Sequence, residues 1–192
     1  AGDGPGNGGA FHLTGAGTVE VKRSTVTDNV AASEGGGLWN SAAGVFTVVD
    51  TVVSGNEAKG NDADQGGGGL FNDGGQLTIL QSTVTNNVAT GTSGSGGGVS
   101  SLGGTLTVRQ TDFSSNVARR AGGGIEIAGG SSTLQAVDLR GNITANNPGN
   151  GGGLHVGGTG SVRYNNGTVA GNLASSEGGG LWNGSTAKLI VS

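Results

Sequence analysis

The chain has 192 residues, of which 45 are glycine and none is cysteine or methionine. Only 11% of the residues are charged and the net charge is −4. This composition excludes a disulfide framework and a thiolate metal site, and it offers no basic surface for a nucleic-acid partner. No apolar run approaches the roughly 18 residues of a membrane-spanning helix, and no stretch of these residues has the pattern of a signal peptide. Because the first residue is Ala1 rather than methionine, we expect a processed product that is secreted, extracellular or at the cell surface.

A glycine cluster followed by an apolar residue recurs along the chain. The last glycines of successive clusters are 28, 32, 29, 26, 29 and 27 residues apart. A period in this range indicates a solenoid, in which each repeat buries its face against its neighbours. The octapeptide SEGGGLWN occurs twice, at 33–40 and at 176–183, which is a separation of 143 residues or five repeats. The seven aligned glycines are Gly9, Gly37, Gly69, Gly98, Gly124, Gly153 and Gly180.

An asparagine also recurs once per repeat, with apolar residues at fixed distances before it. The residue three positions earlier is always apolar, and further apolar residues generally stand eight and ten positions earlier, as Val21 and Val19 do in the first repeat. A period of two within short segments predicts strands, and a helical period is missing. We therefore predict one all-β domain over 1–192, a parallel β-helix of about seven coils of about 28 residues, with three strands per coil and no helices. The recurring asparagines are Asn29, Asn56, Asn87, Asn116, Asn142 and Asn172.

The asparagine column is expected to be a structural ladder. An amide carries a donor and an acceptor, so stacked asparagines can bond from coil to coil, and asparagine tolerates the left-handed backbone of a corner. The glycine clusters are expected to form the next corner, where coils approach closely. The segment between each asparagine and the next glycine cluster varies in length, so insertions are expected there.

Two elements resemble known surface-protein repeats. Residues 113–116 match the FxxN element, and the GGGI of residues 122–125 resembles the GGA[ILV] element, of the polymorphic outer-membrane protein repeats of chlamydiae. The chain is also similar to the repeats of autotransporter passenger proteins at bacterial surfaces. The resemblance implies a right-handed parallel β-helix. Such repeats occur in adhesins, fibres and carbohydrate-active enzymes, so the resemblance does not select an activity.

A few polar residues are candidates for chemistry. An enzyme with this fold would resemble the polysaccharide lyases, which hold Ca²⁺ with acidic side chains and use a basic residue as proton acceptor. Asp112 and Asp138 are expected in one outward column beside Arg140, where a surface ion pair is the alternative interpretation. Glu126 and His155 are expected to be neighbours, but a third catalytic group is missing. We predict no catalytic residue and no enzymatic activity.

The longest loop is the one place where the sequence suggests a metal. Asp62 and Asp64 alternate in the loop 57–65, as Ca²⁺ ligands do, but the terminal glutamate of a calcium loop is missing. The pair is a candidate Ca²⁺ site, with a solvated loop as the alternative, and no other cofactor is predicted. Two pairs of threonines, Thr25 with Thr27 and Thr83 with Thr85, suggest an ice-binding face. Charged residues interrupt this face in later repeats.

The position after each glycine–apolar corner is rich in aromatic residues. In an in-register stack these rings would lie about 4.8 Å apart. They are expected either to pack under loops of their own chain or to form an exposed strip, for assembly or for stacking on sugars. Four of the seven aromatic residues fall at this position, namely Phe11, Trp39, Phe71 and Trp182.

Neither end of the chain resembles the cap of a solenoid. Residues 1–10 resemble 145–154, and the chain stops about seven residues before the next expected asparagine. We expect either a piece of a longer array or ends that pair with another copy. Head-to-tail pairing of identical rods gives a filament, and it would place Trp182 beside Phe11 of the next copy.

The leading hypothesis is therefore an extracellular structural protein whose rods stack into a filament or surface fibre. A fragment of an adhesin that binds cell-surface glycans through the aromatic strip is the alternative. A polysaccharide lyase-like enzyme ranks third.

Overall fold

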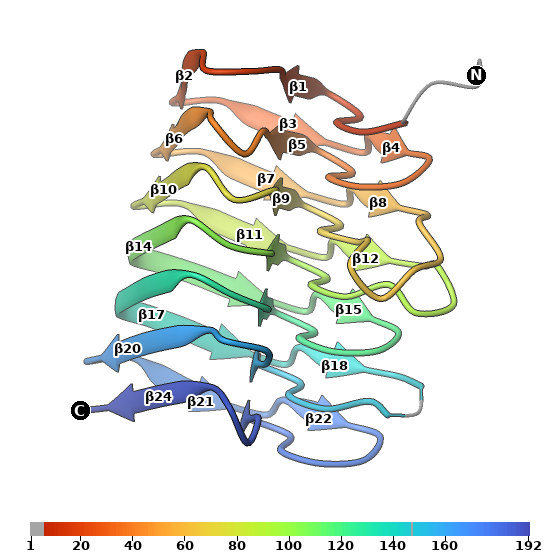
Figure 1. Ribbon diagram of the computed structural model, residues 1–192, viewed down its shortest axis with the longest axis vertical. Helices are drawn as coiled ribbons and strands as arrows, with labels where there is room; N and C mark the ends of the chain where they lie inside the picture. Colours follow the sequence, from red (N-terminus) through yellow and green to blue (C-terminus); the bar gives the residue numbers. More distant parts are fainter. Residues whose placement is uncertain (1–5, 147) are drawn as a thin grey trace.

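The computed structural model describes residues 6–146 and 148–192 and has the form of a stack of β-coils (Figure 1). All pairings between its strands are parallel, and none of the described residues lies in a helix. Three sheets, named A, B and C below, run along the stack. The predicted all-β solenoid is confirmed, with about six turns rather than seven coils, because sheet C has six strands. Residues 1–5, which the sequence likens to 145–149, lie outside the described part.

Sheet A contains one three-residue strand per coil, which begins directly after the glycine cluster. Because the middle residue of each strand faces away from the other two, these strands present one residue to the outer side of the sheet. The strands are β1 (Phe11–Leu13), β5 (Leu38–Asn40), β9 (Leu70–Asn72), β13 (Val99–Ser101), β16 (Ile125–Ile127), β19 (Leu154–Val156) and β23 (Leu181–Asn183).

Sheet B contains the second and third strands of each coil, joined at a corner residue with left-handed backbone. In two coils the strand continues through this corner. The second strands are β2 (Thr18–Lys22), β6 (Val45–Val49), β10 (Gln76–Leu80), β20 (Ser161–Asn165) and β24 (Lys188–Val191), the third strands are β3 (Thr25–Thr27), β7 (Val52–Ser54), β11 (Thr83–Thr85) and β21 (Thr168–Ala170), and the continuous ones are β14 (Thr105–Ser114) and β17 (Ser131–Arg140). The corner residues are Arg23, Asp50, Gln81, Gln110, Ala136 and Asn166, with φ between 48° and 53°.

Sheet C is a fourth segment per coil that the sequence pattern did not predict. Its two-residue strands directly follow the asparagines, and a strand of two residues is too short to display an alternating pattern. The loops of variable length follow these strands, as predicted, and project to one side of the stack (Figure 1). The strands are β4 (Val30–Ala31), β8 (Glu57–Ala58), β12 (Val88–Ala89), β15 (Val117–Ala118), β18 (Ile143–Thr144) and β22 (Leu173–Ala174).

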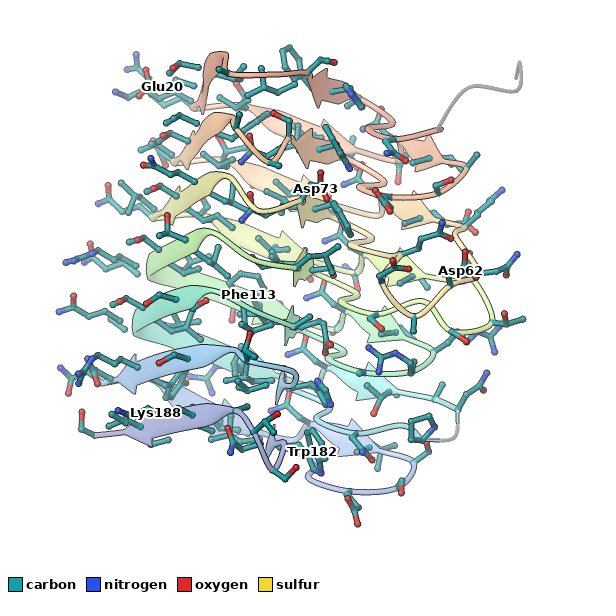
Figure 2. The ribbon with its side chains drawn as sticks, in the orientation of Figure 1. Glu20, Asp62, Asp73, Phe113, Trp182 and Lys188 are labelled. Atoms are coloured by element: carbon teal, nitrogen blue, oxygen red, sulfur yellow. The ribbon has the colours of Figure 1, made fainter. Side chains whose placement is uncertain are left out.

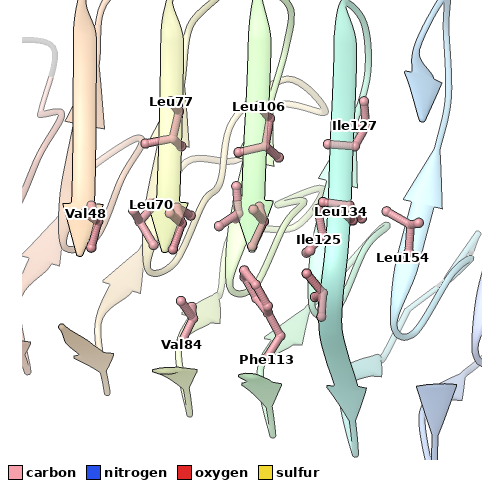
Figure 3. Packing of buried hydrophobic residues seen from close by; sticks show 14 of the residues in the cluster. Val48, Leu70, Leu77, Val84, Leu106, Phe113, Ile125, Ile127, Leu134 and Leu154 are labelled. Atoms are coloured by element: carbon pink, nitrogen blue, oxygen red, sulfur yellow. The ribbon is translucent and has the colours of Figure 1, made fainter. Parts of the chain in front are cut away.

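The core between sheets A and B consists of columns of like residues (Figure 3). Leu77 lies opposite Leu106, and Val84 lies opposite Phe113, each pair in adjacent coils. Their apolar side chains are almost completely buried. Ser132 is a polar exception, buried at the coil position that Leu106 fills one turn earlier. The alternation read from the sequence therefore corresponds to inward-facing positions.

The asparagine corner forms a continuous hydrogen-bonded ladder. In each step the Nδ2 of one asparagine donates to the Oδ1 of the next, with distances of 2.9 to 3.0 Å from Asn29 to Asn172. The same Oδ1 also accepts the backbone N–H of the preceding asparagine. Left-handed backbone is found at the residue before the asparagine, for example Asp28 and Asn86, both with φ of 56°. The amide therefore serves the ladder, and its neighbour makes the turn.

Candidate functional site

The outer face of sheet A has one column of residues that points away from the core. The pairing register defines this column, which we call the sheltered column, as the middle residue of each strand in sheet A. Its members are His12, Trp39, Phe71, Ser100, Glu126, His155 and Trp182.

The prediction that Phe11 belongs to this column is wrong. Phe11 lies opposite Leu38, and His12 lies opposite Trp39. The reason is that Ala10 takes the place of the third glycine of the cluster, so counting from Gly9 shifts the first copy by one residue. The Phe11 ring instead packs edge-on against Phe46, with centroids 5.8 Å apart.

Trp39 and Phe71 do not form an exposed strip. Trp39 is 9% exposed and Phe71 is 1% exposed. Glu34, in the loop after β4, contacts Trp39 through a hydrogen bond to its Nε1. Of the alternatives left open by the sequence, packing under the chain's own loops therefore describes both rings. Trp182, in the last coil, is half-buried (Figure 2).

Planar stacking joins the rings of this column. His12 stacks on Trp39 with centroids 4.2 Å apart and an interplanar angle of 8°, and the other face of Trp39 meets Phe71 at 6.4 Å and 5°. At the opposite end, His155 stacks on Trp182 at 4.3 Å and 6°.

Each tryptophan also donates a hydrogen bond to a glutamate carboxylate. The Nε1 of Trp39 donates to Glu34 Oε2, and that of Trp182 donates to Glu177 Oε2, both at 3.0 Å. Burial raises the pKa of Glu34, and the negative charges of Asp73 and Asp64 raise it further, against the hydrogen bond from Trp39. Each SEGGGLWN copy thus forms the same glutamate–tryptophan unit.

Between the two aromatic groups the column carries a buried ionic cluster. Glu126 is 2% exposed, and its Oε1 lies 3.2 Å from Arg120 Nη2. Its Oε2 lies 2.6 Å from His155 Nδ1, a close contact without the angles of a hydrogen bond. Arg120 also bonds Ser95 Oγ and the carbonyl of Ala63, so it ties two loops over the cluster.

This cluster contains a carboxylate and an imidazole, groups that can transfer protons, and both are almost completely buried, at 2% and 6% exposed. The Oγ of Ser100, the neighbour of Glu126 in the column, is fully buried and has no hydrogen-bond partner among the described residues. A hollow of about 240 Å³ on the described surface lies elsewhere, at the corner between sheets A and B near Gly44 and Gly75, and carries no ionisable side chain. The sequence predicts that Glu126 and His155 are neighbours. It does not predict the contact of Arg120 with Glu126, because Arg120 lies in a loop outside the repeat pattern.

The predicted stack of Asp112 on Asp138 is present. Asp138 Oδ2 lies 2.9 Å from Arg140 Nη2, and its Oδ1 accepts the N–H of Thr168. The hydrogen bond from Arg140 is the main cause that lowers the pKa of Asp138. Asp112 Oδ2 accepts the hydroxyl of Ser114. Both carboxylates are therefore engaged by their own chain.

The candidate Ca²⁺ pair lies on the surface. Asp62 and Asp64 are exposed in a loop beside the stack, where Asp62 N–H bonds Gln65 (Figure 2). Within residues 6–146 and 148–192, no group of three or more His, Cys, Asp or Glu side chains is placed to hold a metal ion.

A second amide ladder escaped the sequence analysis. Asn40 Nδ2 donates to Asn72 Oδ1 at 2.8 Å, and Asn72 Nδ2 donates to Ser101 Oγ at 3.1 Å, all buried at the end of sheet A strands. Its sequence signal is the polar third residue of the triplets LWN, LFN and VSS, which follow the glycine clusters.

No protein-family model matches the chain, and neither a curated protein nor a solved structure matches it. The fold and the sheltered column define a β-solenoid of stacked repeats. Among the described residues there is no helix with the length and hydrophobicity needed to span a membrane.

Proposed function

We propose that the chain is an extracellular structural protein whose rods join end to end into a filament or surface fibre. The observation that carries this proposal is the regularity of the coil-on-coil interface. From β1 to β23 every coil meets the next through the same sheet positions, and the asparagine ladder continues over six coils. An unpaired coil edge of this kind is a template for another coil.

The composition of the sheltered column favours this structural role over glycan binding. Stacking on a sugar requires an accessible ring face, whereas Trp39 lies between His12 and Phe71. The ionic cluster around Glu126 is closed by loops and supports cohesion between coils rather than catalysis.

An end-to-end joint would be stepped. With β1 of one copy paired to β23 of the next, β2 pairs with β24, so sheet A and the second strands of sheet B continue across the joint. Sheet C and the third strands end one coil level earlier, at β22 and β21. The joint therefore has fewer strand pairings than an internal coil contact, and we expect reversible, concentration-dependent association.

Two neighbouring residues of β24 provide a matched test. Leu189 packs against the core, so Leu189→Lys would place a charge inside the joint, whereas Ile190 belongs to the outward column that contains Arg163. We expect the sedimentation coefficient of the native chain to rise with concentration. Leu189→Lys should abolish this rise and Ile190→Lys should preserve it. A native chain that stays monomeric at high concentration, or two variants that behave alike, would contradict the proposal.

A further inference from the structure

The first and last coils of the chain are two copies of one structure. The strands of residues 11–48 recur 143 positions later with the same bounds, so that β1 corresponds to β19, β2 to β20, β3 to β21, β4 to β22 and β5 to β23, and β24 begins where β6 does. The left-handed corners recur as well, for example Gly35 and Gly178, both with φ of 62°.

The side-chain contacts repeat with the backbone. The centroid distances of the two histidine–tryptophan stacks differ by 0.1 Å, at 4.2 Å for His12–Trp39 and 4.3 Å for His155–Trp182. The two tryptophan–glutamate hydrogen bonds have the same length. Residues 168–192 therefore present along the stack the strand edges, corners and tryptophan–glutamate unit that residues 25–49 present.

The partner of the first copy lies in the same chain. Residues 50–80 form the next coil, in which Leu70 pairs with Leu38 and Leu77 with Phe46. Its Phe71 covers the free face of Trp39. From this duplication we infer that the edge formed by β21, β22, β23 and β24 is an interaction surface for a β-coil with the side-chain pattern of residues 50–80.

Within β24 the substitutions between the two copies are compatible with this partner. The inward positions Phe46 and Val48 of the first copy become Leu189 and Val191, which remain apolar. Lys188 and Ile190 replace Val45 and Thr47 at outward positions, away from the core of the contact.

The remaining contacts of the docked coil follow from the register of the first copy. Phe71 of the docked coil would lie on Trp182, and its Val53 would lie on Val169, as it lies on Val26 in the first copy. Its Asn56 Oδ1 would accept from Asn172 Nδ2, which continues the asparagine ladder. The docked coil begins with a third strand, so it fills the step at β21 and β22 that an end-to-end joint leaves open. This inference therefore stands whether or not the native chain associates with itself.

A covalent extension tests the inference directly. Residue 192 corresponds to residue 49, so a chain of residues 1–192 followed by a second copy of 50–80 places the new coil in phase. In a Trp39→Phe background, Trp182 is the single tryptophan. We expect the extension to shift its fluorescence to shorter wavelength and to reduce quenching by acrylamide several-fold relative to the unextended Trp39→Phe chain.

The control is an extension of the same composition in the wrong phase, residues 66–80 followed by 50–65. Protection of Trp182 by the phased extension alone supports the inference. Equal quenching with and without the phased extension, or equal protection by both extensions, overturns it.

A longer extension with residues 50–192 guards against a single added coil that is too short to fold. It is expected to unfold with the parent chain in one transition at a higher temperature. Two separate transitions would also overturn the inference.

Discussion

Asn116 illustrates how one side chain joins three coils. Its Oδ1 accepts the backbone N–H and the Nδ2 of Asn87, and its Nδ2 donates to the carbonyl of Val84 and to Asn142 Oδ1. The recurrence of asparagine in the sequence is enough to predict a ladder. The bond to Val84 could not be read from spacing, because it depends on how the corner folds back over the preceding coil.

Truncation of this amide should destabilise the rod strongly. Asn116→Ala leaves buried N–H and C=O groups without partners, so we expect a loss of about 2–4 kcal/mol in the free energy of unfolding. The Nδ2 of Asn29 donates to Asn56 Oδ1 and to the carbonyl of Thr27. Asn29 is more exposed than Asn116, so water can replace these bonds and Asn29→Ala should cost about 1 kcal/mol or less. Urea denaturation of both variants measures the difference, and equal losses would rule out a cooperative role for the buried ladder.

Tyr164 gives a pH-dependent prediction. Its hydroxyl donates to the carbonyl of Val137 at 2.6 Å and lies 3.1 Å from the carbonyl oxygen of Thr168, and burial raises its pKa to about 12. The unfolded phenol titrates near pH 10. Because the folded pKa is the higher one, the stabilisation is complete below about pH 10 and is lost progressively as the pH rises toward 12.

The measurement is direct because Tyr164 is the single tyrosine. The ultraviolet absorbance of the phenolate in the native protein should appear near pH 12, and Tyr164→Phe should remove the loss of stability between pH 10 and 12. A native phenolate that titrates near pH 10 would contradict the burial of this hydroxyl.

At the scale of elements, the glycine clusters decide how closely the coils approach. A Cβ at Gly97 would collide with the carbonyl oxygens of Gly123 and Val117 in the adjacent coil, whereas a Cβ at Gly103 would meet nothing closer than 3.8 Å. The sequence predicted a close corner at the clusters. It could not separate these two glycines, because the difference depends on the neighbouring backbone.

The pair provides a prediction with an internal control. Gly97→Ala should lower the free energy of unfolding by about 2 kcal/mol or more, because the backbone must shift to relieve the collision. Gly103→Ala should be neutral or stabilise by about 0.4–1 kcal/mol, because it restricts the unfolded chain. Thermal unfolding of both variants provides the comparison, and similar destabilisation by the two would show that the approach of the coils is not the limiting factor.

Strand prediction followed the length of the alternating pattern. Sheet B was predicted because its strands show apolar residues at every second position over several residues, as in Leu77 and Ile79. Sheet C was missed because two residues define no period. The sequence does not determine the burial of Trp39, because that burial depends on how the loop side chains, such as that of Glu34, fold over sheet A.

At the scale of the molecule, the solenoid is built from contacts between adjacent coils. Its period could be read from the glycine spacing, and the five-coil duplication from SEGGGLWN. The sequence alone could not show that the duplicated coils carry the same stacks and corners, because Phe11 rather than His12 was aligned with Trp39. In the structure the two copies make the same histidine–tryptophan and tryptophan–glutamate contacts, and the partner of the first copy is the coil of residues 50–80.

Electron microscopy of the purified chain tests the proposed assembly most directly. A single rod of six to seven coils spaced about 4.8 Å apart is about 30 Å long. We expect particles of one width whose lengths increase with protein concentration, and shorter particles for Leu189→Lys than for Ile190→Lys. Uniform particles of single-rod length at high concentration would contradict end-to-end assembly.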